Sequence, residues 1–437
     1  MSSVPTFAEL MDSITEYLAP SMTRWWPNLP VERAEGIYLY TPDGRRYTDF
    51  TAGLAVANVG YGHPRVVQAA QEQTARMIHS ALGLTHAESP LRLARKLIEV
   101  LPAGMDTLFF GNSGAEAMEA ALKMARFVTK RPGFITCWGG FHGRLMATSA
   151  ITSSKAVYRA RYEPMLPGVH FTNFAYCYRC PVRLKPETCD IACLDSLTTV
   201  FERALPPSEV AAIILEPIQG ESGYIVPPVE FLRRLRRICD THGILLIFDE
   251  IQTGFGRTGR MFAAQTFDVQ PDIMAIAKSI GSGFPLGAVV SRGALMQKWA
   301  AGAHSTTFGG NPVACSAGLA TLEVIRDENL LANSRQMGDR LKRGVKRLQS
   351  RYPIIGDVRG VGLMVGMELI MPGKDKKPNP RAVTRVLESA FERGLITCSA
   401  GLHSHCIRLF PPLIVNAAQI DEALGILDES LAVAMQD

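Results

Sequence analysis

The sequence lacks a run of basic residues and a marked excess of either charge. Its 46 Lys and Arg residues nearly balance 41 Asp and Glu residues, which gives a formal net charge of +5 over 437 residues. A protein that binds nucleic acid or an anionic membrane surface usually presents clustered positive charge. The composition therefore argues against both of these partners.

Long apolar stretches are missing as well. The apolar stretches, such as residues 244–248, are far shorter than the roughly 20 residues that a transmembrane helix needs. The N-terminus, MSSVPTFAELMDSITEYLAP, carries acidic residues where a secretory signal has positive charge followed by an apolar run. We therefore expect a cytoplasmic protein without a membrane-spanning segment.

Cysteine is sparse, and most of it follows no pattern. Four of the nine cysteines form the spacing Cys177-x2-Cys180-x8-Cys189-x3-Cys193. This spacing is compatible with a zinc clip, with two disulfides or with free thiols in a loop, and the sequence leaves all three open. The others show no metal-ligand spacing and are predicted to be small buried side chains: Cys137, Cys239, Cys315, Cys398 and Cys406.

Internal repeats, low-complexity tracts and long linkers are also absent. Over the first three quarters of the chain, short apolar runs alternate with charged helical patterns, which is typical of a parallel sheet with crossover helices. The predicted strands are 107–110, 133–136, 210–215, 244–248, 273–277 and 287–291, and the predicted helices include 115–129 and 229–242.

The pattern changes at about residue 324. A charged helical segment runs to residue 351, a strand pair is predicted within 356–370, a helix at 381–393 and a strand at 406–409. The chain is therefore predicted to be an α/β protein, with a large domain at 51–323 and a smaller α+β domain at 324–437. Residues 1–50 are expected to pack with the smaller domain.

Asp249 ends the apolar strand in GILLIFDEIQ. Ligands of parallel sheets lie at the carboxyl ends of the strands, so this carboxylate would face a crevice. There it could keep the ring nitrogen of a pyridine-containing cofactor protonated, which makes the ring an electron sink. The alternative is that it caps the helix that follows.

Lys278 follows the next predicted strand, in PDIMAIAKSI. A lysine projected from a buried strand into a cleft can lose its proton and form a Schiff base. Gly281 and Gly283 come directly after it, so the backbone can approach a ligand closely. The alternative is a surface lysine whose stem packs on apolar groups.

Two glycine-rich turns are suited to phosphate. The first, GNSGAEAME at 111–119, follows a strand and opens a helix, so the amides of Ser113, Gly114 and Ala115 would point at an anion. An ordinary capped helix start would give a similar pattern. The second turn, STTFGGNP at 305–312, offers hydroxyls and glycines.

Together these segments resemble the class III, or omega, aminotransferases, which have fold type I of the pyridoxal 5'-phosphate (PLP) enzymes. The resemblance runs from about residue 35 to the C-terminus, and long ordered motifs are more specific than one short pattern. The matching segments are LEPIQGESGYIVPP at 215–228, residues 245–289, DFTAGLAVANVGYGHP at 49–64, GGFHGR at 139–144, TTFGGNP at 306–312, GDVRGVGL at 356–363 and IRLFPP at 407–412.

The resemblance implies PLP as cofactor and assigns roles to individual residues. Lys278 would be the Schiff-base lysine and the base that moves a proton between substrate and cofactor, and Asp249 would pair with the pyridine nitrogen. The other implied cofactor contacts are Ser113, Gly114 and Ala115 at the phosphate, Phe141 and Ile251 on the two ring faces, Gln252 at the phenolic oxygen, Glu216, and Thr307 on the phosphate of a partner subunit. The last contact implies a homodimer, or a higher homo-oligomer built from it.

The resemblance also implies how substrates bind. Arg144 matches a position that binds the distal carboxylate of a substrate such as 4-aminobutyrate, and Arg408 matches the arginine that grips the α-carboxylate of glutamate. Glu221 matches a switch residue that neutralises Arg408 when the donor lacks an α-carboxylate. Leu54 and Phe141 differ from the residues of ornithine aminotransferases and dialkylglycine decarboxylases, and favour a 4-aminobutyrate-type pocket.

The predicted function is therefore PLP-dependent transamination between an amino acid or ω-amino acid and a keto acid such as 2-oxoglutarate. A PLP-dependent racemase or epimerase of the same family and an acetylornithine-type aminotransferase remain open as alternatives. A non-catalytic PLP-fold binding module is a third alternative. The presence of both Lys278 and Asp249 argues against a non-catalytic protein.

Overall fold

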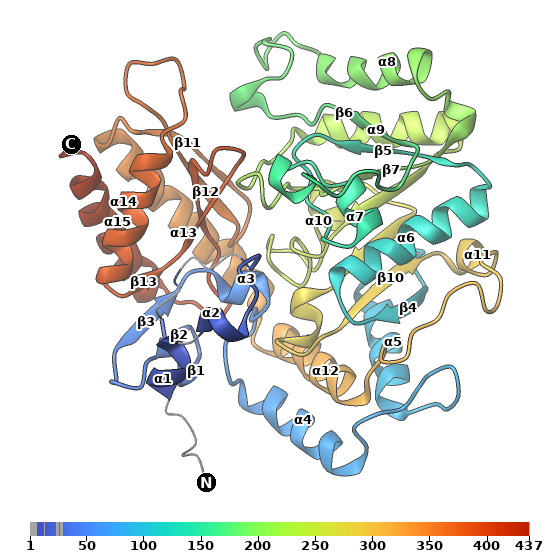
Figure 1. Ribbon diagram of the computed structural model, residues 1–437, viewed down its shortest axis with the longest axis horizontal. Helices are drawn as coiled ribbons and strands as arrows, with labels where there is room; N and C mark the ends of the chain where they lie inside the picture. Colours follow the sequence, from blue (N-terminus) through green and yellow to red (C-terminus); the bar gives the residue numbers. More distant parts are fainter. Residues whose placement is uncertain (1–6, 13, 23–25, 27–28, 437) are drawn as a thin grey trace.

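The computed structural model describes all residues except 1–6, 13, 23–25, 27–28 and 437, so part of the predicted N-terminal segment lies outside the described residues (Figure 1). Strands of the described residues form one seven-stranded sheet and two four-stranded sheets. In Figure 1 the seven-stranded sheet and its helices lie on the right, and helices α13, α14 and α15 lie on the left. The prediction of a large α/β part and a smaller α+β part is confirmed.

The seven-stranded sheet has six parallel strands and one antiparallel strand. Its order is β4 (Thr107–Gly111), β10 (Gly287–Ser291), β9 (Ile273–Ile276), β8 (Leu245–Asp249), β7 (Val210–Leu215), β5 (Gly133–Cys137) and β6 (Val169–Thr172). Strand β10 is antiparallel to both of its neighbours, whereas the remaining pairs are parallel. Every residue of β7 and β9 is buried, as expected for strands covered on both faces.

Helices cover both faces of this sheet. Helix α6 (Gly114–Thr129) packs against one face, where Ile214 and Ile247 belong to the same apolar cluster as its Met118. Neighbouring residues of a strand point to opposite faces, so Ile213 lies in the other cluster. That second cluster also contains residues of α9 (Val229–His242), and α9 lies alongside α8 (Asp195–Arg203) in Figure 1.

The two smaller sheets involve the C-terminal part of the chain. One has the antiparallel order β11 (Ile355–Gly360), β12 (Val365–Leu369), β15 (Cys406–Leu409) and β14 (Cys398–Ala400). The other joins β1 (Arg33–Glu35), β2 (Tyr38–Tyr40) and β3 (Arg46–Asp49) to β13 (Leu395–Ile396), which pairs with β3 in parallel. Strands close to the N-terminus therefore share a sheet with a strand close to the C-terminus.

Longer helices surround these sheets. Helix α12 (Pro312–Asp327) packs on α4 (Pro64–Arg76) and α5 (Glu88–Val100), and α15 (Ala417–Ala434) packs on α13 (Leu330–Arg351) and α14 (Pro380–Glu392). Helix α12 runs through residues 323 and 324, so the predicted domain boundary falls within a continuous helix. The shorter helices are α1 (Phe7–Asp12), α2 (Ile14–Tyr17), α3 (Ala52–Ala55), α7 (Met146–Ala150), α10 (Ala263–Phe267) and α11 (Gly293–Met296).

One buried arginine connects the two parts of the chain. Arg257, which lies shortly after β8, is completely buried and donates hydrogen bonds to the carbonyl oxygens of Leu363 at 3.0 Å and Pro411 at 2.5 Å. Its second nitrogen donates to the side-chain oxygen of Asn58. Burial lowers the pKa of Arg257 to about 10, which still leaves the guanidinium charged at neutral pH. Three distant segments therefore meet at one cation.

The cysteines are free thiols, so neither of the two disulfides that the spacing allowed is present. Two of the four lie in short 3-10 turns, Cys177–Arg179 and Ala192–Leu194. No group of three or more His, Cys, Asp or Glu side chains in the described part of the chain is placed to hold a metal ion, so the zinc alternative lacks an assembled ligand set. The five unpatterned cysteines are buried as predicted. None of the described helices has the length and apolar character to cross a bilayer.

Candidate active site

A cavity of about 470 Å³ lies at the carboxyl ends of β8 and β9. Most of the predicted site residues line it, although they come from segments far apart in the sequence. The lining residues are Ser21, Met22, Leu54, Gly114, Ala115, Phe141, His142, Gly143, Arg144, Tyr158, Glu216, Glu221, Asp249, Ile251, Gln252, Lys278 and Arg408. Of the predicted residues, only Ser113 and Thr307 are not part of this lining.

The central pair is Lys278 and Asp249. Strands β8 and β9 are parallel neighbours, with Asp249 opposite Ala275, and Lys278 follows two residues after the end of β9. The sheet therefore delivers the carboxylate and the amine to the same edge. Burial lowers the pKa of Lys278, although the negative charge of Asp249 opposes the shift. A lysine with a lowered pKa is a better nucleophile and base at neutral pH.

The carboxylate of Asp249 is fixed by its neighbours. Its Oδ2 lies 2.8 Å from Nδ1 of His142, and its Oδ1 accepts a hydrogen bond from the amide of Ile251 at 3.1 Å. Both Asp249 and His142 are buried. Because an ionised carboxylate can only accept, His142 donates through Nδ1 and holds the acid in one orientation. His142 was missed by the sequence analysis, although it lies within the GGFHGR motif.

Glu216 connects two loops of the cavity wall. Its Oε1 accepts from the amide of Phe141 at 2.9 Å, and its Oε2 accepts from the amide of Gly220 at 2.8 Å. Burial raises the pKa of Glu216 to about 7. The side chain thus positions both the aromatic ring of Phe141 and the turn that carries Glu221.

The N-terminus of α6 forms another wall. The amides of Gly114 and Ala115 belong to its first turn and have no acceptor within the helix, which leaves them available to an anion. A Cβ atom on Gly114 would lie 2.9 Å from Cδ1 of Ile251, so a larger residue here would require the side chain of Ile251 to shift. Ser113 instead uses its hydroxyl to accept from the amide of Glu116 at 3.1 Å, which makes it the N-cap of the helix.

Two arginines and one glutamate also line the cavity. Arg408 is buried, and its Nη1 lies 3.4 Å from Oε2 of Glu221 while its Nη2 lies 3.3 Å from Sγ of Cys398. Burial alone would lower the pKa of Arg408, but Cys398 and Glu221 hold it above its ordinary value. Arg144 is exposed, and its guanidinium lies 4.1 Å from the ring centre of Tyr158.

These groups match the chemical requirements of PLP. An amine and a carboxylate face one cavity, a helix N-terminus offers amides to a phosphate, and Phe141 and Ile251 supply apolar contacts. The side-chain oxygen of Gln252 is buried and has no hydrogen-bond partner in the described structure. A polar group of a bound molecule would satisfy it. Thr307 is exposed in the single chain, where it could contact only a molecule outside this cavity or a second subunit.

The comparison with protein families decides the identity of this site. The family described as aminotransferase class-III matches residues 21–431. The chain belongs to the class-III aminotransferases. Members of this family use PLP, which agrees with the cofactor that the cavity accommodates.

Relatives of this aminotransferase have different activities. It is 36% identical to an alanine/serine racemase of Pyrococcus horikoshii over 98% of this chain and 90% of the relative. It is 40% identical to a 5-aminovalerate aminotransferase of Pseudomonas aeruginosa over 91% of this chain and 92% of the relative. Among solved structures, a taurine:2-oxoglutarate aminotransferase of Bifidobacterium kashiwanohense, in complex with PLP and glutamate, matches with a TM-score of 0.90 and 30% identity over 98% of both chains.

Two further site residues of this aminotransferase were missed by the sequence analysis. Tyr158 lies in the 3-10 turn Ala156–Tyr158, and Lys155 precedes that turn as its N-cap residue. Both side chains approach Glu221, which is more than 60 residues away in the sequence. Neither residue belongs to a motif quoted above, so no local signal could have revealed the contact.

Proposed function

We propose that this aminotransferase moves amino groups between an ω-amino acid with a terminal carboxylate, such as 4-aminobutyrate or 5-aminovalerate, and 2-oxoglutarate. The observation that carries this proposal is the pair of arginines in one cavity with Lys278. Arg408 is covered by Glu221, whereas Arg144 has no carboxylate partner among the described residues. An ω-amino acid needs one arginine, and glutamate needs both. The relative that acts on 5-aminovalerate supports this assignment.

We propose the following roles for the residues around the cofactor. Bound PLP supplies a protonated aromatic ring that withdraws electrons from the substrate carbon. Lys278 would hold the cofactor covalently, and its amine would serve as the base that moves a proton from the substrate carbon to the cofactor. Asp249, oriented by His142, keeps the ring nitrogen protonated. Phe141 and Ile251 would supply apolar contacts to the ring, Gln252 would offer its unpartnered side-chain oxygen to a polar group of the cofactor, and the amides of Gly114 and Ala115 would bind the phosphate.

The alternative function is racemisation of a neutral amino acid, which the 36% identity to an alanine/serine racemase favours. We expect the holoenzyme to consume 5-aminovalerate and form glutamate only when 2-oxoglutarate is present. A single enantiomer of alanine supplied without a keto acid should stay unchanged, as measured by chiral chromatography. Inversion of the enantiomer would support a racemase instead. A strong preference for acetylornithine as donor would support the acetylornithine-type alternative.

Arg144 tests the proposed substrate class. We expect Arg144→Ala to lower kcat/KM for 4-aminobutyrate by about 30-fold or more, because the distal carboxylate loses its charged partner. For a simple aliphatic amine, which has no carboxylate, the change should stay within about threefold. Arg144→Lys keeps the charge without the planar fork and should fall between the two. Steady-state kinetics with both donors measures the ratio. Equal losses on both donors would contradict the carboxylate role.

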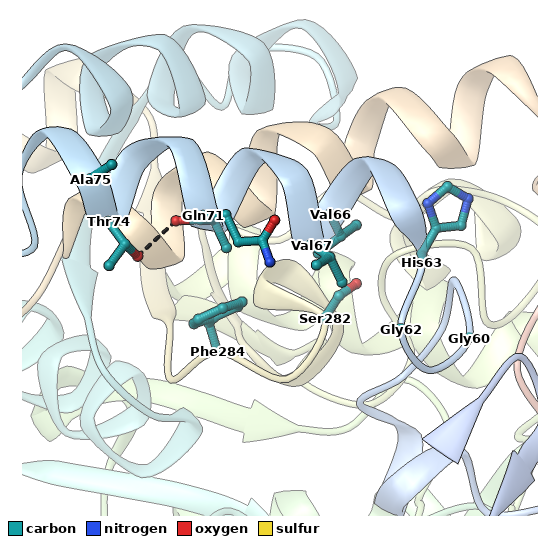
Figure 2. A pocket seen from close by; sticks show the side chains of 11 residues that line it. Gly60, Gly62, His63, Val66, Val67, Gln71, Thr74, Ala75, Ser282 and Phe284 are labelled. Atoms are coloured by element: carbon teal, nitrogen blue, oxygen red, sulfur yellow. Dashed lines mark hydrogen bonds between the residues drawn. The ribbon is translucent and has the colours of Figure 1, made fainter. Parts of the chain in front are cut away.

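We also propose that the working unit is a homodimer in which Thr307 contacts the phosphate bound by the partner subunit. The surface around Thr307 supports this, because it exposes large apolar side chains that water would solvate poorly: Met77, Ile78, Leu84, Leu91 and Phe308. A groove of about 510 Å³ lies along α4, where Val66, Val67 and Ala75 line it together with Phe284 of the segment after Lys278 (Figure 2). A second copy would cover such surfaces.

The remaining two proposals concern organisation and location. We propose domain limits near residues 50 and 323, supported by the sheet that joins β3 to β13, although α12 crosses the second limit. We propose a cytoplasmic location. Nine free thiols fit a reducing compartment, in which disulfides rarely form.

A further inference from the structure

The carboxylate of Glu221 has partners on both of its oxygens. Its Oε2 lies 3.4 Å from Nη1 of Arg408. Its Oε1 lies 3.4 Å from Nζ of Lys155 and accepts a hydrogen bond from the hydroxyl of Tyr158 at 3.1 Å. One negative charge is therefore shared between two cations that come from distant segments of the chain.

These groups are mostly removed from solvent. The side chains of Glu221, Lys155 and Arg408 are 15%, 21% and 3% exposed. Water and salt screen such contacts much less than they screen surface ion pairs. Burial raises the pKa of Tyr158 to about 12, so its hydroxyl stays protonated and remains a donor to Glu221.

Glu221 therefore needs another partner whenever Arg408 binds a substrate. When the α-carboxylate of glutamate or 2-oxoglutarate binds Arg408, the Oε2 atom of Glu221 loses its cation. A partly buried carboxylate without any partner is strongly unfavourable. Lys155 and Tyr158 still hold the other oxygen, so the negative charge of Glu221 remains neutralised.

We propose that Lys155 and Tyr158 form a second anchorage for Glu221, which allows Arg408 to exchange Glu221 for a substrate carboxylate. This inference rests on the proposed function, because it concerns the acceptor side of that reaction. Lys155 acts as a positioning residue, since it contacts Glu221 and not the substrate. In this way the anchorage determines how readily one cavity accepts both monocarboxylate and dicarboxylate substrates.

The local structure suits this role. Lys155 and Tyr158 lie three residues apart on either side of one 3-10 turn, so a single short segment delivers the ammonium and the hydroxyl together. Lys155 forms no other ion pair in the described part of the chain. The ring of Tyr158 also supports the guanidinium of Arg144 at 4.1 Å. The same segment therefore contacts both carboxylate-binding parts of the cavity.

Equilibrium binding separates the two kinds of carboxylate ligand. Glutarate has the two carboxylates of 2-oxoglutarate and must displace Glu221 from Arg408, whereas valerate has one carboxylate and leaves Glu221 in place. For the holoenzyme of Lys155→Met, we expect the Kd of glutarate to rise about tenfold and that of valerate to stay within about twofold. Isothermal titration calorimetry gives both constants without turnover.

Three further variants make the test specific. Lys155→Arg keeps the positive charge and should bind glutarate nearly as tightly as the wild type. In a Glu221→Gln background, Lys155→Met should have no further effect on glutarate, because the charge it serves is gone. Lys342→Met removes a half-buried lysine that donates to the carbonyl of Gly360 and does not line the cavity, so it should change neither constant.

An unchanged glutarate Kd in Lys155→Met, or an equal rise for glutarate and valerate, would overturn the anchorage. Half-reactions give a second readout. In Lys155→Met, the reaction of 2-oxoglutarate with enzyme whose cofactor carries the amino group should slow about tenfold. The reaction of 4-aminobutyrate with enzyme whose cofactor is in the aldehyde form should change little. A wild-type enzyme that transfers amino groups from no ω-amino acid would refute the proposed function itself. A wild type that does so, beside a Lys155→Met variant with normal glutarate binding, would refute only the anchorage.

Discussion

Lys278→Ala is expected to lower the rate of transamination by at least about 10³-fold, because we propose that this one amine serves both as nucleophile and as proton carrier. Its pKa is lowered by burial in the cavity, and alanine offers no group that could replace it. Single-turnover measurements with 4-aminobutyrate give the rate. Borohydride reduction followed by peptide mass analysis tests the covalent link, which should be found on the peptide that contains Lys278.

The control for this prediction is Lys346→Ala, which removes an exposed lysine from α13 and should keep wild-type activity and the same modified peptide. Residual activity of Lys278→Ala within about tenfold of the wild type would be incompatible with its dual role. A modified peptide that contains another lysine would be equally incompatible, because the attachment site would then lie elsewhere.

Asp249→Asn should lower kcat by about 10²- to 10³-fold while leaving the fold intact. Asparagine has nearly the same shape as aspartate and can still contact Nδ1 of His142 and the amide of Ile251. It carries no negative charge, so it cannot keep a ring nitrogen protonated, and the ring becomes a weaker electron sink. Steady-state kinetics together with the melting temperature separates loss of chemistry from loss of structure.

The neighbouring buried acid provides a matched control. Glu250 is completely buried, burial raises its pKa to about 7, and it accepts hydrogen bonds from the amides of Ala263 and Ala264 at 3.0 and 2.6 Å. Glu250→Gln removes a buried carboxylate next to Asp249 in sequence but outside the cavity lining, so activity per folded protein should change only a few-fold. If both variants lost activity equally, general destabilisation would explain the loss.

The features that the sequence predicted best are those that depend on residues close together along the chain. Asp249 and Lys278 each follow a short buried strand, and the rule that ligands lie at the carboxyl ends of parallel strands was enough to bring them together. The strands at 210–215 and 287–291 and the helix at 229–242 were found with the predicted limits. The direction of β10 was not decided by its sequence, because a fully buried strand has the same apolar run in either orientation.

Features that depend on contacts between distant segments could not be read from the sequence. His142 meets Asp249 across 107 positions, and Tyr158 meets Glu221 across 63. Polar residues such as these have no periodicity that would indicate a partner. The role of Ser113 was ambiguous for a different reason. A serine before a helix can bind a phosphate or cap the helix, and the sequence does not distinguish these two roles. In the structure its hydroxyl accepts from the amide of Glu116, which is the capping geometry.

The buried guanidinium of Arg257 has a consequence for how precisely an α-carboxylate is placed in the cavity. It joins the segment after β8, which carries Asp249, to Pro411, which lies just beyond the strand of Arg408. Arg257 thus connects the carboxylate-binding end of the cavity, at Arg408, with the reactive end, at Asp249. This connection keeps the distance between the two ends constant. An α-carboxylate bound at Arg408 would therefore be held at a set distance from the reacting carbon, where a misplacement of about 1 Å costs about 100-fold in rate.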